Sequence, residues 1–414
     1  MLFQKRYRRS RFDRRRARRF GGLPILLLLI SIPVGLELLA LLIVKVANLS
    51  QQLTLDRSPA IVKAYQLKFV NPSGQPYQTL SKSGELVAVH NLLMGYHLAP
   101  TQQSEFWTIN EQGFRDQDPV PPAKPNGEVR IFVLGGSTAF GQLSSSNPTT
   151  FTEKLETRLN EQVKQQQANA DRFQPAVLPF RADQVGNALA LPPRIREQQY
   201  RVINAAVPGY ASGNELALLV QHVADYNPDI LVVLNSYADL MLPSDQIGVG
   251  IPGLDGILQN QRESLSSRIT NSIQRWFGQL SAVRLFQYYG LQLRPPEERL
   301  VKPLNLMAED GEAALIDHLA IEEAELNLRV QRYRQHLLQM VRWTSGARKR
   351  LIIGLQPEIS GRSADVLTPE EAEILKQLGG PYIEAVQTGY GRLAEAANQA
   401  AQTSENAKVL NLYR

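Results

Sequence analysis

The sequence predicts an α/β fold with a parallel sheet covered by helices on both faces, preceded by one N-terminal transmembrane helix. Two observations lead to this prediction. Short apolar runs alternate with helix-like segments from about residue 130 onward, which is the pattern of βαβ units. Leu23–Val44 is 22 residues long and carries Glu37 as its only formal charge. About 20 apolar residues are enough to span a bilayer as a helix.

Basic residues are concentrated at the start of the chain. Residues 1–20 contain ten Lys or Arg and one Asp, whereas the remainder holds 35 basic and 38 acidic residues. Because positive charge beside a membrane span marks its cytoplasmic side, we expect a cytoplasmic N-terminus and an extracytoplasmic main domain. A basic arm in this position contacts anionic lipid, so no nucleic-acid partner is expected. A cleaved signal peptide is the nearest alternative, but its apolar region is usually shorter.

The predicted organisation therefore has four parts. Residues 1–20 form a basic cytoplasmic arm, and residues 21–47 form a transmembrane anchor that contacts the lipid bilayer. Residues 48–115 are polar and rich in turn residues, which predicts a spacer with short strands. Residues 116–414 form the main domain, and a mostly helical insertion covers about 240–345 within it.

Five short apolar runs of the main domain predict the strands of the sheet. Parallel strands that are buried on both faces have nearly continuous apolar sequences. Helical patterns cover about 150–164, about 212–226 and the region between residue 355 and about 402. Residues 165–199 are an irregular insertion rich in Gln and Pro. The predicted strands are Arg130–Leu134, Arg201–Val207, Asp229–Leu234, Arg350–Leu355 and Lys408–Leu412.

Small and polar residues follow three of these strands. Ser137 comes after Gly135-Gly136, Gly209 follows the second strand, and Asp239 follows the third. Since ligands of open α/β sheets bind at the carboxyl ends of the strands, these positions are the candidate site. A structural role also fits each residue, because Ser137 and Asp239 are helix-capping types and Gly209 is a turn residue.

These segments together resemble the SGNH (GDSL-like) hydrolases. The similar residues are Gly135–Thr138, Asn204–Tyr210, Asn235–Asp239, the lead-in Asn110–Arg115, and Leu355-Gln356-Pro357 followed by Leu367–Glu371. The resemblance implies a flavodoxin-like three-layer α/β/α sandwich. It also implies that Ser137 is the nucleophile and that the backbone N–H groups of Ser137 and Gly209 stabilise an oxyanion. Asp239 is a further candidate catalytic residue.

Two elements of the family's pattern differ in this sequence. The family's third block supplies an Asn side chain to the oxyanion, and Ala238 stands at that position; we expect Asn235 to point elsewhere. The family's last block is Asp-x-x-His, and none of the five histidines has Asp three residues before it. His318 and His336 lie about 27 Å apart along a helical pattern, so at most one of them can reach Ser137.

Several other chemistries are excluded. The absence of Cys excludes disulfides and thiolate chemistry. Gln142 and Leu143 stand where a P-loop requires Lys and Ser or Thr. Ala139 replaces the last glycine of the G-x-S-x-G motif. No metal-ligand spacing occurs, so we expect neither a cofactor nor a metal.

The predicted function is a membrane-anchored SGNH-like serine esterase or acyl-transfer domain. It would act on ester-linked acyl groups of the cell envelope, carried by an acylated glycan, a lipid or a small ester. Because two blocks of the family's pattern differ in this sequence, we expect its catalysis to be impaired. The alternative is a non-catalytic SGNH-fold protein that binds such a ligand or serves as a scaffold for an envelope protein. A third interpretation is an incomplete chain of an active enzyme.

Overall fold

The five predicted strands form one parallel sheet in the computed structural model, which describes residues 59–76, 84–91, 94–244 and 315–413. The strand order is β10-β9-β8-β6-β7, and every neighbouring pair is parallel. The α/β prediction is thereby confirmed for the sheet. The strands are β6 (Glu128–Gly135), β7 (Gln199–Asn204), β8 (Ile230–Asn235), β9 (Arg350–Leu355) and β10 (Ala407–Asn411).

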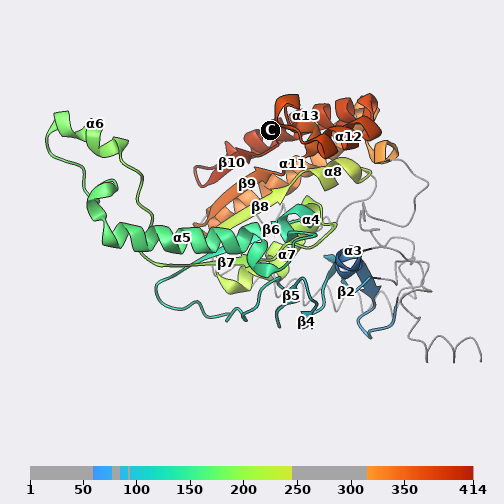
Figure 1. Ribbon diagram of the computed structural model, residues 1–414, viewed down its shortest axis with the longest axis horizontal. Coiled ribbons are helices and arrows are strands. Elements are labelled where there is room, and N and C mark those ends of the chain that lie inside the picture. The colour runs from blue at the N-terminus through green and yellow to red at the C-terminus, as the bar shows by residue number, and fades with distance from the viewer. Residues whose placement is uncertain (1–58, 77–83, 92–93, 245–314, 414) are drawn as a thin grey trace, which may run out of the picture. The chain divides into compact units, whose positions relative to one another are not determined.

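Helices connect the strands along the chain and pack on the sheet (Figure 1). Helix α11 contacts α7, α13 and β9, so these three helices share one face of the sheet. From β6 the chain first crosses to β7 at one edge of the sheet, and the connections from β7 to β8, β9 and β10 then run toward the other edge. Because such crossovers are right-handed, α5, which connects β6 to β7, packs on the other face. The helices are α4 (Ser137–Phe140), α5 (Phe151–Ala168), α7 (Ser212–Gln221), α8 (Tyr237–Met241), α11 (Glu323–Gly346), α12 (Pro369–Leu378) and α13 (Gly380–Ala401).

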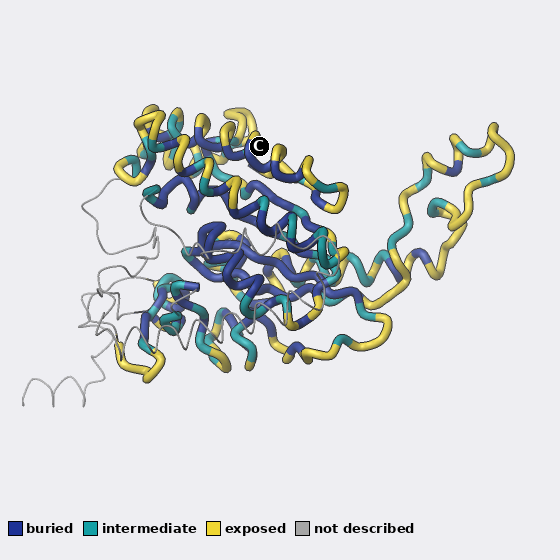
Figure 2. Tube along the Cα trace, turned by 180° about the vertical axis from the view of Figure 1, so that it is seen from behind, coloured by how far each residue is buried: buried dark blue, intermediate teal, exposed yellow. Residues whose placement is uncertain are grey.

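The insertion that we predicted at 165–199 projects from the sheet (Figure 2). It continues α5 through the short helices Ala170–Arg172 and α6 (Ala182–Ala190) before the chain returns to β7. Its tip is exposed, with Val177 and Phe180 at relative accessibilities of 83% and 106%. Part of the other predicted insertion, 240–345, lies outside the described residues, whereas α11 packs on the sheet.

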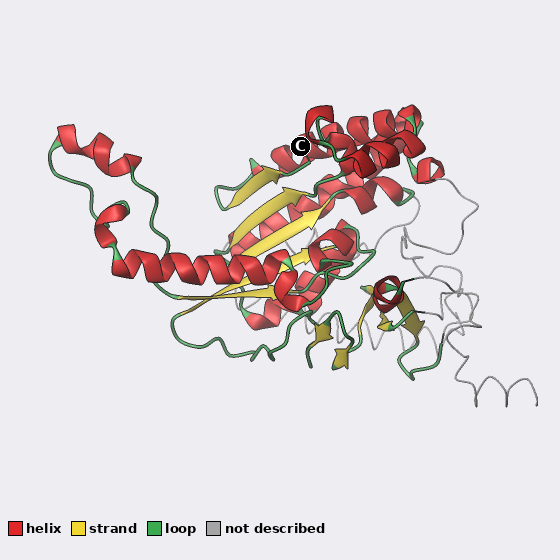
Figure 3. Ribbon diagram, in the orientation of Figure 1, coloured by secondary structure: helices red, strands yellow, loops and turns green. Residues whose placement is uncertain are grey.

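Short strands precede the main sheet, beside helix α3 (Ala60–Tyr65). Strand β1 pairs parallel with β2, and β2 pairs antiparallel with β3; β4 and β5 form a separate two-stranded ribbon (Figure 3). The described residues from Ala60 onward belong to one compact unit. The strands are β1 (Leu67–Val70), β2 (Leu86–Asn91), β3 (Gly95–Leu98), β4 (Gln102–Gln103) and β5 (Thr108–Ile109).

The predicted basic arm, 1–20, and anchor, 21–47, lie outside the described residues. Across the part of the chain that the structure describes, no helix has the length and hydropathy that a membrane span requires.

The lead-in segment Asn110–Arg115 turns sharply and ends on a buried arginine. The Asn110 side chain accepts hydrogen bonds from the backbone N–H groups of Gln112 and Phe114, both at 3.0 Å. Gly113 has φ +82°, and a Cβ there would come within 2.9 Å of the carbonyl oxygen of Leu98. Because only glycine meets both conditions without strain, the turn depends on this residue.

The Arg115 guanidinium, 2% exposed, donates five hydrogen bonds. Its partners come from α3, the segment before β5, α4 and the following loop, and its planar fork suits several acceptors at once. The rings of Tyr65 and Phe140 flank it, with centroids at 5.2 and 4.8 Å. The acceptors are the Tyr65 hydroxyl, the Asn147 side-chain oxygen and the carbonyl oxygens of Phe106, Phe140 and Gly141, at 2.7–3.1 Å.

We predict that Arg115→Met lowers the free energy of unfolding by about 3–5 kcal/mol, because buried carbonyl groups lose their donors. Urea denaturation of the full chain in detergent measures the change. The matched control is Arg392→Met, which removes an exposed arginine and its ion pair with Glu323 and should cost less than about 1 kcal/mol. Equal losses in the two variants would contradict a special role for Arg115.

Candidate active site

A pocket of about 300 Å³ lies at the carboxyl end of the central sheet. Strand β6 lies between β7 and β8, so the connections that leave β6 and β7 diverge at this point. Open α/β sheets bind ligands at such a switch point. The lining comes from the ends of four strands and the start of α13: Gly136, Ser137, Thr138, Gly209, Tyr210, Asn235, Tyr237, Ala238, Gln356, Glu358 and Tyr382.

Ser137 is placed by two glycines that let the chain turn tightly after β6. Gly135 has φ +153°, and a Cβ there would lie 2.3 Å from the carbonyl oxygen of Leu234 on β8. A Cβ on Gly136 would lie 3.0 Å from the carbonyl oxygen of Tyr210. Ser137 then begins α4, half-buried in the pocket, and its hydroxyl has no hydrogen-bond partner among the described residues. Backbone N–H groups at the start of a helix have no partner within it.

Helix α4 has four residues and cannot be stable by itself, because helix nucleation is unfavourable at such lengths. Its carbonyl groups are instead bound by side chains. The Asn204 amide donates to the carbonyl oxygens of Ala139 and Phe140, both at 3.2 Å. Arg115 donates to Phe140 and to Gly141 beyond it. The position of Ser137 thus depends on two polar residues far from it in sequence.

Gly209 lies in the loop between β7 and α7, with φ +84°. Aromatic residues hold this loop: the Tyr96 hydroxyl donates to the carbonyl oxygen of Pro208 at 2.7 Å, and the Tyr210 hydroxyl donates to the carbonyl oxygen of Tyr96. The loop is also joined to β6 through the N–H of Val207, which donates to the Gly135 carbonyl oxygen at 3.0 Å. The structure therefore brings Gly209 and Ser137, two of the three predicted site residues, into one pocket.

The segment after β8 presents Ala238 to the pocket, so this position offers no polar side chain. Ser236 precedes it with φ +125°, a conformation that serine rarely adopts. Asn235, which we expected to point elsewhere, also lines the pocket. Its amide donates to Glu215 at 2.6 Å and its carbonyl oxygen accepts from the Tyr333 hydroxyl at 3.1 Å, so buried groups hold both ends of the side chain.

Asp239, the third predicted site residue, is 1% exposed and does not line the pocket. Its carboxylate accepts hydrogen bonds from the backbone N–H and the hydroxyl of Ser212. The Ser212 hydroxyl also lies 2.9 Å from Nδ1 of His336. These three types of residue form a catalytic triad elsewhere, but Ser212 is fully buried here and occupies the middle of the network.

Burial controls the ionisation of this network. It raises the pKa of Asp239, which the hydrogen bonds from Ser212 partly offset. It raises the pKa of Glu215 well above its usual value, and the charge of Asp239 adds to this effect. Burial and, to a lesser extent, the charge of Arg332 together lower the pKa of His336 to about 4. At neutral pH His336 is therefore uncharged, and the network behind the pocket is a structural polar core.

None of the five histidines, all of which lie in the described residues, lines the pocket around Ser137. Its ionisable groups are Glu358, Tyr210, Tyr237 and Tyr382. The hydroxyls of Tyr237 and Tyr382 lie 2.8 Å apart, and burial raises the pKa of Tyr237 to about 12. Glu358 accepts from the N–H and hydroxyl of Ser360. Among the described residues, no side chain of this lining is hydrogen-bonded to the Ser137 hydroxyl, so none is already placed to remove its proton.

Sequence reasoning missed Glu358 and Tyr382 as parts of the site. Glu358 directly follows Leu355-Gln356-Pro357, the segment at the end of β9 that the sequence analysis had already singled out. Its position near the site could therefore have been predicted from the sequence. Tyr382 lies at the start of α13, and no sequence pattern relates it to the other strand ends. Among the described residues, no group of three or more His, Asp or Glu could hold a metal ion.

Comparisons with known proteins give only distant likenesses. No protein-family model matches the sequence, and no curated protein does. An acetylxylan esterase mutant from Geobacillus stearothermophilus aligns with TM-score 0.27 and 12% identity, covering 69% of this chain and 76% of that one. A Bacteroides fragilis structure assigned as an acylhydrolase aligns with TM-score 0.26 and 10% identity, over 71% and 72%. These low scores carry no argument about function.

We predict that His336→Asn flattens the dependence of stability on pH between 6.5 and about 4. Unfolded histidine binds a proton near 6.5, whereas buried His336 does so only near 4. The unfolded state therefore binds more protons in this window, and wild type loses up to about 3 kcal/mol as pH falls through it. Urea denaturation of both proteins at several pH values measures the difference. Glu215 and Asp239 occur in both proteins, so their contributions to the pH dependence cancel in the comparison. If stability falls equally with pH in wild type and in His336→Asn, the lowered pKa of His336 is contradicted.

Proposed function

We propose that this chain is an SGNH-type serine ester hydrolase or acyl-transfer domain, with the flavodoxin-like strand order of that family and weak intrinsic activity. The observation that carries the proposal is that Ser137 and Gly209 line one pocket at the switch point of the sheet. In the reaction the Ser137 oxygen attacks an ester carbonyl, and the tetrahedral intermediate expels the alkoxide to give the acyl-enzyme. The proton that Ser137 loses passes through solvent to the leaving alcohol. Water or a second alcohol then releases the acyl group.

The geometry around Ser137 supports stabilisation of an oxyanion. The N–H of Ser137 lies in the first turn of α4, and that of Gly209 belongs to a loop held by Tyr96 and Tyr210. Preorganised N–H groups stabilise the charge that develops in acyl transfer. The third donor is missing because Ala238 has no polar side chain, and removal of one such donor costs about 10²–10³ in rate.

The weakness of the proposed activity has a second cause. The pocket lacks a histidine, and Glu358 is engaged by Ser360. A serine whose proton has no general base loses most of the nucleophilic advantage of a triad. Binding and oxyanion stabilisation alone still give residual catalysis of about 10³–10⁴ over water.

The proposal includes the cellular setting inferred from the sequence. Residues 21–47 anchor the chain in the bilayer, residues 1–20 remain in the cytoplasm, and the main domain acts outside on acylated glycans, lipids or small esters of the envelope. The apolar length of Leu23–Val44 and the adjoining basic run support this arrangement.

The second candidate is a non-catalytic binding or scaffold domain of the envelope. The absence of histidine from the Ser137 pocket and the alanine at position 238 favour it. The pocket would then hold an acyl or glycan ligand, or contact an envelope protein, without forming a covalent intermediate.

We predict that a fluorophosphonate probe labels the wild-type chain slowly at Ser137 and does not label Ser137→Ala. The reason is that Ser137 is accessible and has N–H donors beside it, but no base. Gel fluorescence with increasing time gives the rate, and mass spectrometry gives the site. Thr138→Ala, which changes the exposed neighbour, is the control. Equal labelling of wild type and Ser137→Ala would refute the role of Ser137 as the nucleophile. No labelling of wild type would favour the second candidate, a non-catalytic binding or scaffold domain.

We predict that Ala238→Asn accelerates this labelling by about 10–100-fold, because the amide supplies the missing oxyanion donor. The same time course measures the effect. Ala238→Leu adds a side chain that is branched at the same carbon but has no donor, so it should label no faster than wild type. If Ala238→Asn and Ala238→Leu have equal rates, position 238 does not face the oxyanion.

A further inference from the structure

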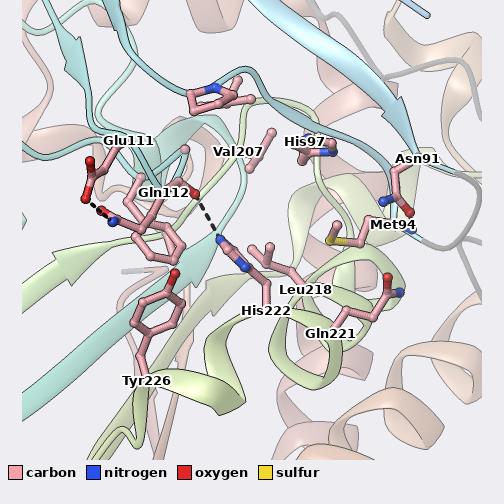
Figure 4. A pocket seen from close by; sticks show the side chains of 15 residues that line it. Asn91, Met94, His97, Glu111, Gln112, Val207, Leu218, Gln221, His222 and Tyr226 are labelled. Atoms are coloured by element: carbon pink, nitrogen blue, oxygen red, sulfur yellow. Dashed lines mark hydrogen bonds between the residues drawn. The ribbon is translucent and has the colours of Figure 1, made fainter. Parts of the chain in front are cut away.

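A second cavity of about 550 Å³ lies between α7, β3 and the lead-in segment that ends at Arg115 (Figure 4). Its volume is in the range of small-molecule sites. No residue of its lining belongs to the Ser137 pocket. The two cavities share only the loop between β7 and α7, where Val207 lines this cavity and Gly209 lines the other.

One wall of this cavity is aromatic. The ring centroid of Phe114 lies 5.0 Å from that of His222 and 5.5 Å from that of Tyr226. Met94 and Leu218 extend the apolar surface from the side of β3 and α7, as Figure 4 shows. A planar apolar group can pack against such rings with favourable offset or edge contacts.

Two buried polar atoms of the lining have no partner among the described residues: Nδ1 of His97 and Nε2 of Gln221. Unpaired buried polar groups are costly and rare in native proteins. The amide of Gln221 offers N–H donors, so the complementary group is an acceptor oxygen. His222 differs, because its Nε2 lies 2.9 Å from the carbonyl oxygen of Gln112 and donates to it.

The charge balance of the cavity indicates a neutral ligand. No Lys or Arg lines it, and its only carboxylate, Glu111, is exposed and accepts a hydrogen bond from the Gln112 side chain. Burial lowers the pKa of His97, and the nearby His222 lowers it further, so His97 is uncharged at neutral pH. An ionised head group would be desolvated here without a counter-charge, which is strongly unfavourable.

We propose that this cavity binds an uncharged small molecule with an aromatic or apolar body and a carbonyl group, such as an amide or ester. The body packs against Phe114, Tyr226 and Met94, and the carbonyl oxygen accepts a hydrogen bond from Gln221 Nε2. His97 contributes a second polar contact. The site is independent of Ser137 and of any ester hydrolysis there.

The experiment uses the full chain in detergent, labelled with ¹³C at the methionine methyl groups, and phenylacetamide as the probe. Met94 lines the cavity, whereas Met241 and Met340 are fully buried elsewhere. The ring current of a bound probe should shift the Met94 resonance saturably and leave those of Met241 and Met340 unchanged. Phenylacetate has the same shape and a charge, and it should bind at least about tenfold more weakly.

Variants separate this site from its alternatives. Gln221→Leu should weaken phenylacetamide binding about tenfold through loss of one hydrogen bond, and His97→Phe should also weaken it. The matched control Gln399→Leu, on the exposed side of α13, and Ser137→Ala should bind as wild type does. Unchanged Met241 and Met340 resonances establish that each variant is folded. An unshifted Met94, equal binding of phenylacetate, or unchanged affinity in both Gln221→Leu and His97→Phe would overturn the proposal.

Discussion

The candidate active site depends on how the carbonyl groups of a four-residue helix are satisfied. Helix α4 carries Ser137 and is too short to persist by itself. Arg115 and Asn204 bind its last carbonyls, and Arg115 also binds the hydroxyl of Tyr65 on α3. A desolvated guanidinium is costly unless its donors are paired. With five donors placed on five acceptors, Arg115 joins α3 and the segment before β5 to α4 and the loop after it.

The same requirement for paired polar groups explains the core behind the pocket. The Ser212 hydroxyl joins Asp239 to His336, while Glu215 and Tyr333 hold the two ends of Asn235. Such networks are stable when every member is satisfied and otherwise destabilise the fold. Burial raises the pKa of Glu215 and leaves His336 uncharged at neutral pH, so it opposes charge on both groups. The network orients the segment after β8 but is closed to a substrate.

Much of the sheet could be predicted from sequence because buried parallel strands are continuous apolar runs. Arg350–Leu355 was predicted to the residue, whereas the predicted strand 201–207 ends at Asn204, since the remaining residues form the loop that carries Gly209. Ser137 and Gly209 were recognisable because they follow strand ends. Tyr382 and the burial of Asp239 depend on long-range packing, which a local sequence pattern does not report.

The predicted boundary at residue 115 divides groups that act together. Tyr96 on β3 holds Pro208, the residue before Gly209, and Asn214 of α7 donates to the carbonyl oxygen of Met94. Phe114 packs against Phe132 of β6 and His222 beside α7. A segment with these contacts sets the conformation of the β7–α7 loop, which separates the two cavities. The loop forms part of the wall of both cavities, since Val207 lines one of them and Gly209 lines the other.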